Sequence, residues 1–365
     1  MDEVIILVKS IPATHFPYGE EAVEDEYFLS AKIRRVYEKL EDDISKNIFC
    51  NRLLYSLTYD YAYIRKILHE TKAGISLLSD LENVDDLYVY GAGIRGARLA
   101  KIFPGKIKGY IDKYKTGLCE GYPIYGLEYI PNILDSTFLI ANKKYSIEIK
   151  TYLLSIGVKK ILDLKDYDDV ASENRYFDTT CIKDVIDFSR SFVDIGCYDG
   201  EDTIRYLNLS KNPDSPVMAF EADPENYEVC KKNLKEFTSI RLFPFGIGME
   251  TSKKKFYREG NVNARFSEEG DIEIQVYPLD KFMNISDIGM IKIDVEGLEY
   301  DVLKGAKNII SKKKPIIAIS VYHKCEDIWN LPNVILDLHP NYRFYLRHYS
   351  VGITDTVLYA IPINK

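Results

Sequence analysis

The spacing of apolar residues changes along this chain of 365 residues. From Glu20 to Leu81, apolar side chains recur every three or four positions, as at Ile33, Val36 and Leu40, which predicts amphipathic helices. From Leu87 onward, short apolar runs alternate with segments of helical spacing, a pattern typical of α/β folds with parallel sheets. We therefore expect a helical accessory region over residues 1–83, followed by α/β domains.

Residues 84–170 carry the pattern of a small Rossmann-like domain. A strand that begins at Leu87 leads into glycines with the spacing Gly91-x-Gly93-x-x-Gly96, and a helical segment follows. The next strand ends at Asp112, whose carboxylate could hold a ribose. This context predicts binding of a nucleotide or nucleotide-sugar, because glycines let a ligand approach the backbone at a helix start. A purely structural unit fits the same pattern, and both interpretations stay open.

Residues 185–365 predict a seven-stranded sheet, after a polar and aromatic linker at residues 173–184. Five apolar strands alternate with helices, which implies a parallel sheet, and two final strands joined by a short connection must be antiparallel. Such a parallel sheet with a terminal antiparallel hairpin is the class I methyltransferase fold. The polar stretch Glu259–Gly270 indicates a mobile loop over the substrate, within a β excursion. The expected strands are Phe192–Ile195, Val217–Glu221, Ile240–Phe245, Met290–Asp294, Pro315–Tyr322, Tyr342–Tyr349 and Thr356–Pro362.

The stretch from Ser191 to Asp202 predicts a cofactor site. A strand, a glycine turn and a helix start follow one another there, and the glycines let backbone amides approach a nucleotide-like ligand. Because the turn is crowded with acids, it would repel a pyrophosphate and attract a cation. This combination points to S-adenosylmethionine, whose ribose hydroxyls we expect Glu221 to accept. The expected cofactor-binding residues are Asp194, Gly196, Cys197, Tyr198, Gly200, Thr203, Glu221, Ala222, Gly246 and Asp294.

Candidate catalytic groups follow the fourth and fifth predicted strands. A hydroxyl acceptor must lose its proton during methyl transfer, and His323 is the first choice of base because imidazole titrates near neutral pH. Asp294 or Glu296 could orient this imidazole or take the proton directly. The alternative is that His323 is a hydrogen-bonded histidine without a catalytic role. A divalent metal held by these three residues is a further alternative that we do not favour, since Mg²⁺ and Mn²⁺ suit all-oxygen sites better.

Substrate contacts are expected from Tyr322, Arg347 and His348, which also lie at or near strand ends. The guanidinium of Arg347 would clamp an acidic acceptor or balance the charge of Glu296. For His348 a structural role fits equally well.

Five sequence blocks in a fixed order resemble the FkbM family of S-adenosylmethionine-dependent O-methyltransferases, over residues 192–362. They read VDIGCYDGEDT, FEADP, IKIDVEGLEYDVLKGA, AISVYHKCEDIW and YRFYLRHYS. Cys197-Tyr198 departs from the Ala-Asn of many relatives. The resemblance implies methyl transfer to a hydroxyl of a sugar, nucleotide-sugar or glycan, often in surface polysaccharide or antibiotic assembly. Residues 84–170 are similar to the nucleotide-sugar-binding N-terminal domains of bacterial sugar-modifying enzymes.

Two other functions stay open at the level of sequence. The main alternative is a non-catalytic nucleotide-sugar-binding or scaffold protein in glycan assembly. A dehydrogenase that binds NAD at Gly91–Gly96 is a weaker alternative, because no second catalytic set accompanies that loop.

Composition narrows the choice of partners and compartment. A net charge of -8 without a basic stripe argues against nucleic acid. No apolar run approaches the ~20 residues of a membrane span, and the start is too short and acidic for a signal peptide, so we expect a cytoplasmic protein without an integral membrane segment. The six cysteines lack C-x-x-C spacing, which predicts neither a zinc site nor a disulfide framework. The sequence leaves a homo-oligomer open.

Overall fold

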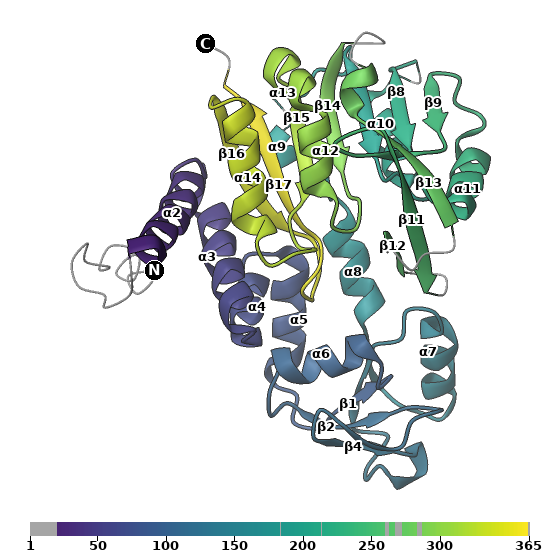
Figure 1. Ribbon diagram of the computed structural model, residues 1–365. Helices are drawn as coiled ribbons and strands as arrows, with labels where there is room; N and C mark the ends of the chain where they lie inside the picture. The colour runs from purple at the N-terminus through teal and green to yellow at the C-terminus, as the bar shows by residue number, and fades with distance from the viewer. Residues whose placement is uncertain are drawn as a thin grey trace. The chain divides into compact units, whose positions relative to one another are not determined.

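The computed structural model describes residues 20–182, 184–212, 214–259, 263–266, 272–282 and 287–363 (Figure 1). The chain forms two compact units. Unit 1 comprises Met1–Lys46, Tyr176–Arg347 and Val357–Lys365, as far as these are described, and unit 2 comprises Asn47–Arg175 and His348–Thr356. The division of the chain at residues 83 and 170 stays a prediction.

Unit 1 is built on a seven-stranded sheet of order β16-β17-β15-β14-β7-β8-β9. Strands β9, β8, β7, β14 and β15 are parallel to their neighbours, whereas β17 is antiparallel to β15. This arrangement confirms the class I methyltransferase fold. The strands are β7 (Ser191–Ile195), β8 (Val217–Phe220), β9 (Ile240–Phe243), β14 (Ile288–Ile293), β15 (Ile316–Ser320), β16 (Tyr342–His348) and β17 (Thr356–Pro362).

The order of these strands indicates where a ligand is expected to bind. Chain order runs outward from β7 to β8 and β9 on one side, and the fourth strand of the set, β14, then returns to the other side of β7. In open α/β sheets, ligands bind beyond the carboxyl ends of the strands at such a reversal of strand order. The ends of β7, β8, β14 and β15 therefore define where a site is expected.

Helices cover the large sheet, and local sequence explains several of their starts. Asp223 caps the start of α11 by accepting from the backbone N–H groups of Glu225 and Asn226, and Pro224 occupies its first turn. Near the chain start, α2 packs on α14, where Arg35 Nη1 lies 2.5 Å from Asp337 Oδ1. The helices of unit 1 are α2 (Glu20–Tyr37), α9 (Thr179–Ile182), α10 (Glu201–Ser210), α11 (Pro224–Leu234), α12 (Glu299–Gly305), α13 (Lys307–Lys313) and α14 (Asp327–Leu338).

A second, smaller sheet of unit 1 has the order β10-β13-β11-β12. It corresponds to the predicted β excursion. The mobile loop that we predicted at Glu259–Gly270 lies largely outside the described residues. The strands are β10 (Gly246–Ile247), β11 (Ser252–Glu259), β12 (Asn263–Phe266) and β13 (Ile272–Tyr277), and the 3-10 turn η2 (Leu279–Phe282) follows.

Unit 2 contains the predicted Rossmann-like sheet, of order β3-β4-β2-β1-β5-β6. Only the β3–β4 pair is antiparallel. The strands are β1 (Leu87–Tyr90), β2 (Ile107–Ile111), β3 (Gly117–Cys119), β4 (Tyr122–Tyr125), β5 (Thr137–Ile140) and β6 (Lys160–Asp163). The helices of this part are α3 (Asp43–Thr58), which begins in unit 1, α4 (Tyr61–Leu68), α5 (Lys72–Glu82), α6 (Ile94–Ile102), α7 (Ser146–Ser155) and α8 (Leu164–Ser172).

Together, α2 to α5 confirm that the described N-terminal part of the chain, from residue 20 to residue 82, is helical. None of the helices in the described ranges is both long and apolar enough to cross a membrane.

Candidate active site

The glycine turn after β7 packs directly against the loop after β14. Gly196 has a φ of 78°, and a Cβ at this position would clash with the carbonyl oxygen of Asp294. The backbone N–H groups of Gly196 and Cys197 donate to Phe220 O at the end of β8. Gly200, with a φ of 85°, starts α10. Glycine is therefore required at position 196 for two reasons: the positive φ, and the close approach of the segment after β7 to the segment after β14.

A buried lysine, Lys292, holds the backbone of this turn by a hydrogen bond. Lys292 on β14 is 2% exposed, and its Nζ donates to Gly196 O at 2.7 Å and lies 3.0 Å from Asp194 Oδ1. The ammonium also lies over the ring of Tyr176, 5.1 Å from its centre. Burial opposes the charge on Lys292, but the carboxylates of Asp194 and Asp202 outweigh it and raise the lysine pKa. Lys292 is thus a fixed cation beneath the predicted cofactor turn.

Asp194 is the partner of this cation. Its side chain is fully buried, and Oδ2 accepts a hydrogen bond of 2.8 Å from Thr203 Oγ1. Both Asp194 and Thr203 were expected to contact the cofactor. Because both side chains are buried, they support the turn more readily than they contact the cofactor. Direct contact of Asp194 and Thr203 with the cofactor stays a prediction.

Glu221 follows β8 and lies beside the turn. Oε2 accepts from the backbone N–H of Tyr198, and Oε1 accepts from that of Asp223, each at 2.8 Å. Burial raises the pKa of this carboxyl to about 7, although both backbone hydrogen bonds oppose the shift. The remaining lone pairs of a carboxylate in this position suit the hydroxyls of a ribose.

The other residues of the predicted cofactor set differ in exposure. The Cys197 thiol is buried, with its Sγ 3.4 Å from Cys230 Sγ, and that hydrogen bond together with burial raises the Cys197 pKa well above its ordinary value. Tyr198 is 57% exposed, so its side chain is available at the surface of the turn. Ala222 is half-buried after β8, and Gly246 is buried in β10.

An imidazole and three carboxylates meet after β14 and β15. We call Asp294, Glu296, Glu299 and His323 the imidazole–carboxylate cluster. His323 Nδ1 lies 2.9 Å from Glu299 Oε1, whereas Nε2 lies 3.5 Å from Glu296 Oε2 and 3.7 Å from Asp294 Oδ1. Burial lowers the pKa of His323, but Glu299 and the other two carboxylates reverse this effect and raise it to about 9. The imidazole of His323 is therefore protonated at neutral pH in the absence of a ligand.

Sequence reasoning found three members of this cluster and missed Glu299. Glu299 is 1% exposed at the first residue of α12, and its Oε1 also accepts from Val295 N at 3.0 Å. The signal was present, because a glutamate just inside a helix start often folds back onto the preceding backbone. Its position three residues after Glu296 places it on the same loop.

Tyr176 also belongs to the site, although the sequence predicted only a linker there. Its hydroxyl donates to Asp294 Oδ2 at 2.7 Å and lies 3.1 Å from Ser320 Oγ. The side chain is fully buried. No spacing in the sequence could indicate this contact, because 118 positions separate the two residues.

The predicted substrate residues fall into two groups. The Tyr322 ring lies 4.1 Å from the His323 ring, measured between centres, and therefore borders the cluster. Arg347 Nη2 lies 2.6 Å from Asp42 Oδ2, and Nη1 donates to Ser45 Oγ at 3.0 Å. These bonds favour a structural role for Arg347, and its substrate role stays a prediction.

His348 is held in the same manner within unit 2. Nδ1 lies 2.8 Å from Thr356 Oγ1, and Nε2 lies 3.0 Å from Gly352 O. Burial lowers the pKa of His348 to about 3, so the imidazole is neutral. Of the two readings left open from sequence, these contacts favour the structural one.

The glycine loop of unit 2 is fastened by Asp112. Oδ2 accepts from the backbone N–H of Ala92 at 2.9 Å, and Oδ1 accepts from the N–H groups of Tyr114 and Lys115. A Cβ on Gly96 would clash with Gly91 O, whereas one on Gly93 would meet open space. Gly91 and Gly96 thus serve the packing of α6 on β1, and nucleotide binding at Gly91, Gly93, Gly96 and Asp112 stays a proposal.

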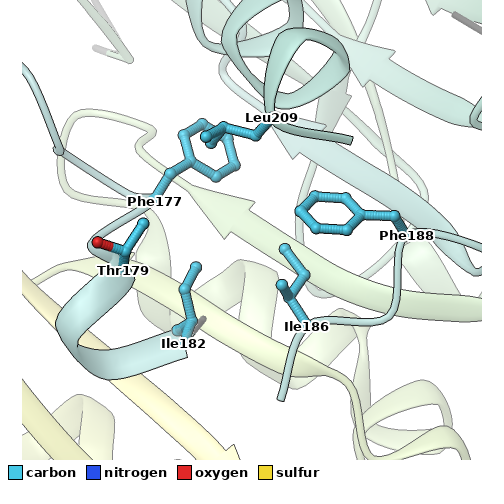
Figure 2. Close-up of a pocket in the computed structure, with 6 residues that line it drawn as sticks. All are labelled: Phe177, Thr179, Ile182, Ile186, Phe188 and Leu209. Carbon is cyan, nitrogen blue, oxygen red and sulfur yellow. The ribbon is translucent and has the colours of Figure 1, made fainter. Parts of the chain in front are cut away.

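Unit 1 also contains a cavity of about 140 Å³, whose lining differs in chemical character from the imidazole–carboxylate cluster (Figure 2). Figure 2 shows its lining, which is apolar except for one hydroxyl and carries no titratable group. It therefore offers no catalytic group. Its lining residues are Phe177, Thr179, Ile182, Ile186, Phe188 and Leu209.

The buried Lys292–Asp194 pair yields a stability prediction. Lys292→Met leaves the Asp194 carboxylate buried without its cation, which should lower the free energy of unfolding of unit 1 by about 3–5 kcal/mol. The chain's single tryptophan, Trp329, lies in unit 1, so its fluorescence during urea unfolding measures this change.

The matched control for this experiment is Lys313→Met. Lys313 forms an exposed pair with Asp287, and its loss should cost about 0–1 kcal/mol. Combining Lys292→Met with Asp194→Leu should recover part of the loss, because no unpaired charge remains. An equal cost for the two lysine variants would contradict the assigned role of the buried pair.

Part of the chain matches a known protein family and a curated relative. Residues 194–350 match the family model described as Methyltransferase FkbM domain. The 2-O-methyltransferase NoeI of Sinorhizobium fredii (strain NBRC 101917 / NGR234) is 27% identical over 193 residues, which cover 46% of this chain and 77% of NoeI.

Solved structures of similar proteins include the methyltransferase FkbM of Methylobacillus flagellatus KT. It has 19% identity and a TM-score of 0.46, and the match covers 84% of this chain and all of the other. The M. capricolum protein TrmK, solved with S-adenosylhomocysteine, has 18% identity and a TM-score of 0.34 over 52% of this chain and 69% of its own. Residues 194–350 of this chain thus match a methyltransferase FkbM domain, and the strand order described above is that of the class I methyltransferase fold.

Proposed function

We propose that this methyltransferase transfers the methyl group of S-adenosylmethionine to a hydroxyl of a sugar, nucleotide-sugar or glycan. The observation that carries the proposal is the pairing of β14 with both β7 and β15. Because of this pairing, the acidic glycine turn after β7 and the imidazole–carboxylate cluster after β14 and β15 lie at the same edge of the sheet. A cofactor site and an acceptor site are therefore neighbours.

The chain's residues fit S-adenosylmethionine at the glycine turn. Glu221 would accept the ribose hydroxyls, and Gly196 lets the turn adopt its positive-φ conformation close to the loop after β14. The surrounding acids favour the sulfonium and amino charges of this cofactor. When bound, S-adenosylmethionine supplies an electrophilic methyl carbon.

The imidazole–carboxylate cluster supports an acceptor that must lose a proton. A sugar hydroxyl is a weak nucleophile at neutral pH, and a positioned base or cation activates it. Glu296 is the most accessible member of the cluster, with 65% of its side chain exposed, and the His323 side chain is 10% exposed. The relative NoeI is a 2-O-methyltransferase, which supports oxygen as the atom that accepts the methyl group.

The proposal differs from the alternative of a non-catalytic nucleotide-sugar-binding or scaffold protein in glycan assembly. A scaffold protein does not need an imidazole surrounded by three carboxylates. Placement in surface polysaccharide synthesis and in the cytoplasm is part of the proposal and rests on the sequence resemblance and on the composition.

Cofactor affinity should depend on Glu221. We expect Glu221→Ala to weaken binding of S-adenosylhomocysteine at least tenfold, about 1.4 kcal/mol, in calorimetric titration, because the ribose loses its acceptor. Glu228→Ala is the matched control, since Glu228 is an exposed glutamate on α11. Equal affinities in the wild type and Glu221→Ala, or no binding at millimolar ligand, would argue against the proposal.

The same carboxyl predicts how affinity depends on pH. With a pKa of about 7, Glu221 is protonated at pH 6 and ionised at pH 8, and the ionised form is the better acceptor. Affinity for S-adenosylhomocysteine should therefore rise about tenfold from pH 6 to pH 8. Glu221→Gln should flatten this dependence, and an unchanged slope in that variant would show that another group titrates.

Catalysis should depend on His323. In His323→Ala, methyl transfer from radiolabelled S-adenosylmethionine to a panel of sugars and nucleotide-sugars should fall at least 100-fold, because the acceptor loses its activating group. Affinity for S-adenosylhomocysteine should stay within about twofold. If no acceptor in the panel is methylated by the wild type while the cofactor binds, the scaffold alternative gains support.

A further inference from the structure

We infer that Asp294, Glu296 and His323 bind one divalent transition-metal ion, and that Glu299 and Tyr176 orient two of these ligands. The catalytic use of the ion rests on the proposed function. The binding site itself does not, because it follows from contacts within unit 1.

Distances within the cluster support a shared ion. His323 Nε2 lies 3.5 Å from Glu296 Oε2 and 3.7 Å from Asp294 Oδ1, which is too long for hydrogen bonds. Two ligand atoms that each lie about 2.1 Å from one metal, at roughly 110–120°, are roughly 3.4–3.6 Å apart. The distance from His323 Nε2 to Glu296 Oε2 falls in this range, and the distance to Asp294 Oδ1 is 0.1 Å longer, so a small side-chain movement brings either carboxylate within reach of a cation beside Nε2.

Buried atoms without hydrogen bonds point to the same place. Within the described part of the chain, His323 Nε2 has no hydrogen-bond partner, although 90% of the side chain is covered. Glu299 Oε2 likewise has none, in a side chain that is 1% exposed. Buried polar atoms are normally satisfied, so these two atoms are available to a bound ion or water.

Glu299 and Tyr176 supply the outer contacts that metal ligands usually have. The Nδ1–H of His323 donates to Glu299 Oε1, which leaves the Nε2 lone pair for a metal. Tyr176 donates to Asp294 Oδ2, which directs Oδ1 toward the imidazole. One donor atom each of Asp294, Glu299 and His323 also lie within 4.8 Å of one another, a spacing that allows these three side chains to share one metal ion.

The ligand types indicate the class of metal. Mg²⁺ and Ca²⁺ prefer sites made of oxygen alone. Mn²⁺ also prefers oxygen but accepts an imidazole among its ligands, and Fe²⁺, Co²⁺ and Zn²⁺ suit an imidazole with carboxylates better. From sequence alone we did not favour a metal, because all-oxygen sites suit Mg²⁺ and Mn²⁺ better than two carboxylates and one imidazole do. Orientation of the ligands by Glu299 and Tyr176, which the sequence did not indicate, changes that assessment.

In the proposed reaction, such an ion would activate the acceptor. An acceptor hydroxyl bound to a divalent metal has a lowered pKa, so its O–H bond breaks and the proton leaves to solvent. The oxygen electron pair then forms the new bond to the methyl carbon. The carbon–sulfur bond breaks, and sulfur keeps that electron pair as a neutral thioether.

The test is direct titration of the metal without cofactor. Tag-free full-length protein, stripped with EDTA and dialysed, is titrated calorimetrically with MnCl₂ and with ZnCl₂. We expect about one ion per chain, at least tenfold weaker binding in His323→Ala and Glu296→Gln, and about tenfold weaker binding in Glu299→Gln and Tyr176→Phe. His339→Ala, a histidine of unit 1 outside the cluster, should leave the affinity unchanged.

Absence of binding at millimolar Mn²⁺ and Zn²⁺, or binding that His323→Ala and Glu296→Gln leave unchanged, would overturn the inference. Glu296 is largely exposed, so its variant tests the site without disturbing packing, and Trp329 fluorescence checks the fold of each variant. A parallel titration with S-adenosylhomocysteine separates the two proposals. Cofactor binding without metal binding overturns only the metal site, whereas metal binding without cofactor binding overturns only the proposed function.

Discussion

The buried ammonium of Lys292 is the interaction on which the site depends. It joins β14 to the glycine turn through Gly196 O, to β7 through Asp194, and to the ring of Tyr176. A cation without these partners could not stay charged in the core, and the turn without the cation would lose its fixed position against β14. The proposed cofactor and acceptor sites are therefore held in one frame by a single charge.

The imidazole–carboxylate cluster extends this frame, because its side chains are oriented by hydrogen bonds to their neighbours. Tyr176 fixes one oxygen of Asp294, and Glu299 fixes the imidazole of His323. Each orienting residue is buried, so that it constrains its partner without competing for the acceptor. The outcome is a set of polar atoms that face one another and favour a positive charge, which the chain supplies as a proton on His323 in the absence of any ligand.

The sequence predicted those features that local patterns of residues indicate. Strands, the glycine turn and the acids at strand ends follow from apolar spacing and from chemistry within a few residues. Tyr176 and Glu299 were missed for different reasons, the first because its partner is distant in sequence, the second because a buried glutamate resembles an ordinary helix-start residue. From sequence, Arg347 was expected to clamp an acidic acceptor or to balance Glu296; its pairing with Asp42, 305 positions away, is a contact that local signals could not indicate.

A structure of the chain with S-adenosylhomocysteine bound tests the central claim most directly. The account predicts ribose hydroxyls on the Glu221 carboxylate and a sulfur atom that faces Asp294 and His323, close enough for an acceptor oxygen to approach the transferred carbon within about 3–3.5 Å. Adenosine bound instead at the Gly91–Gly96 loop of unit 2, or a sulfur atom directed away from the cluster, would contradict it.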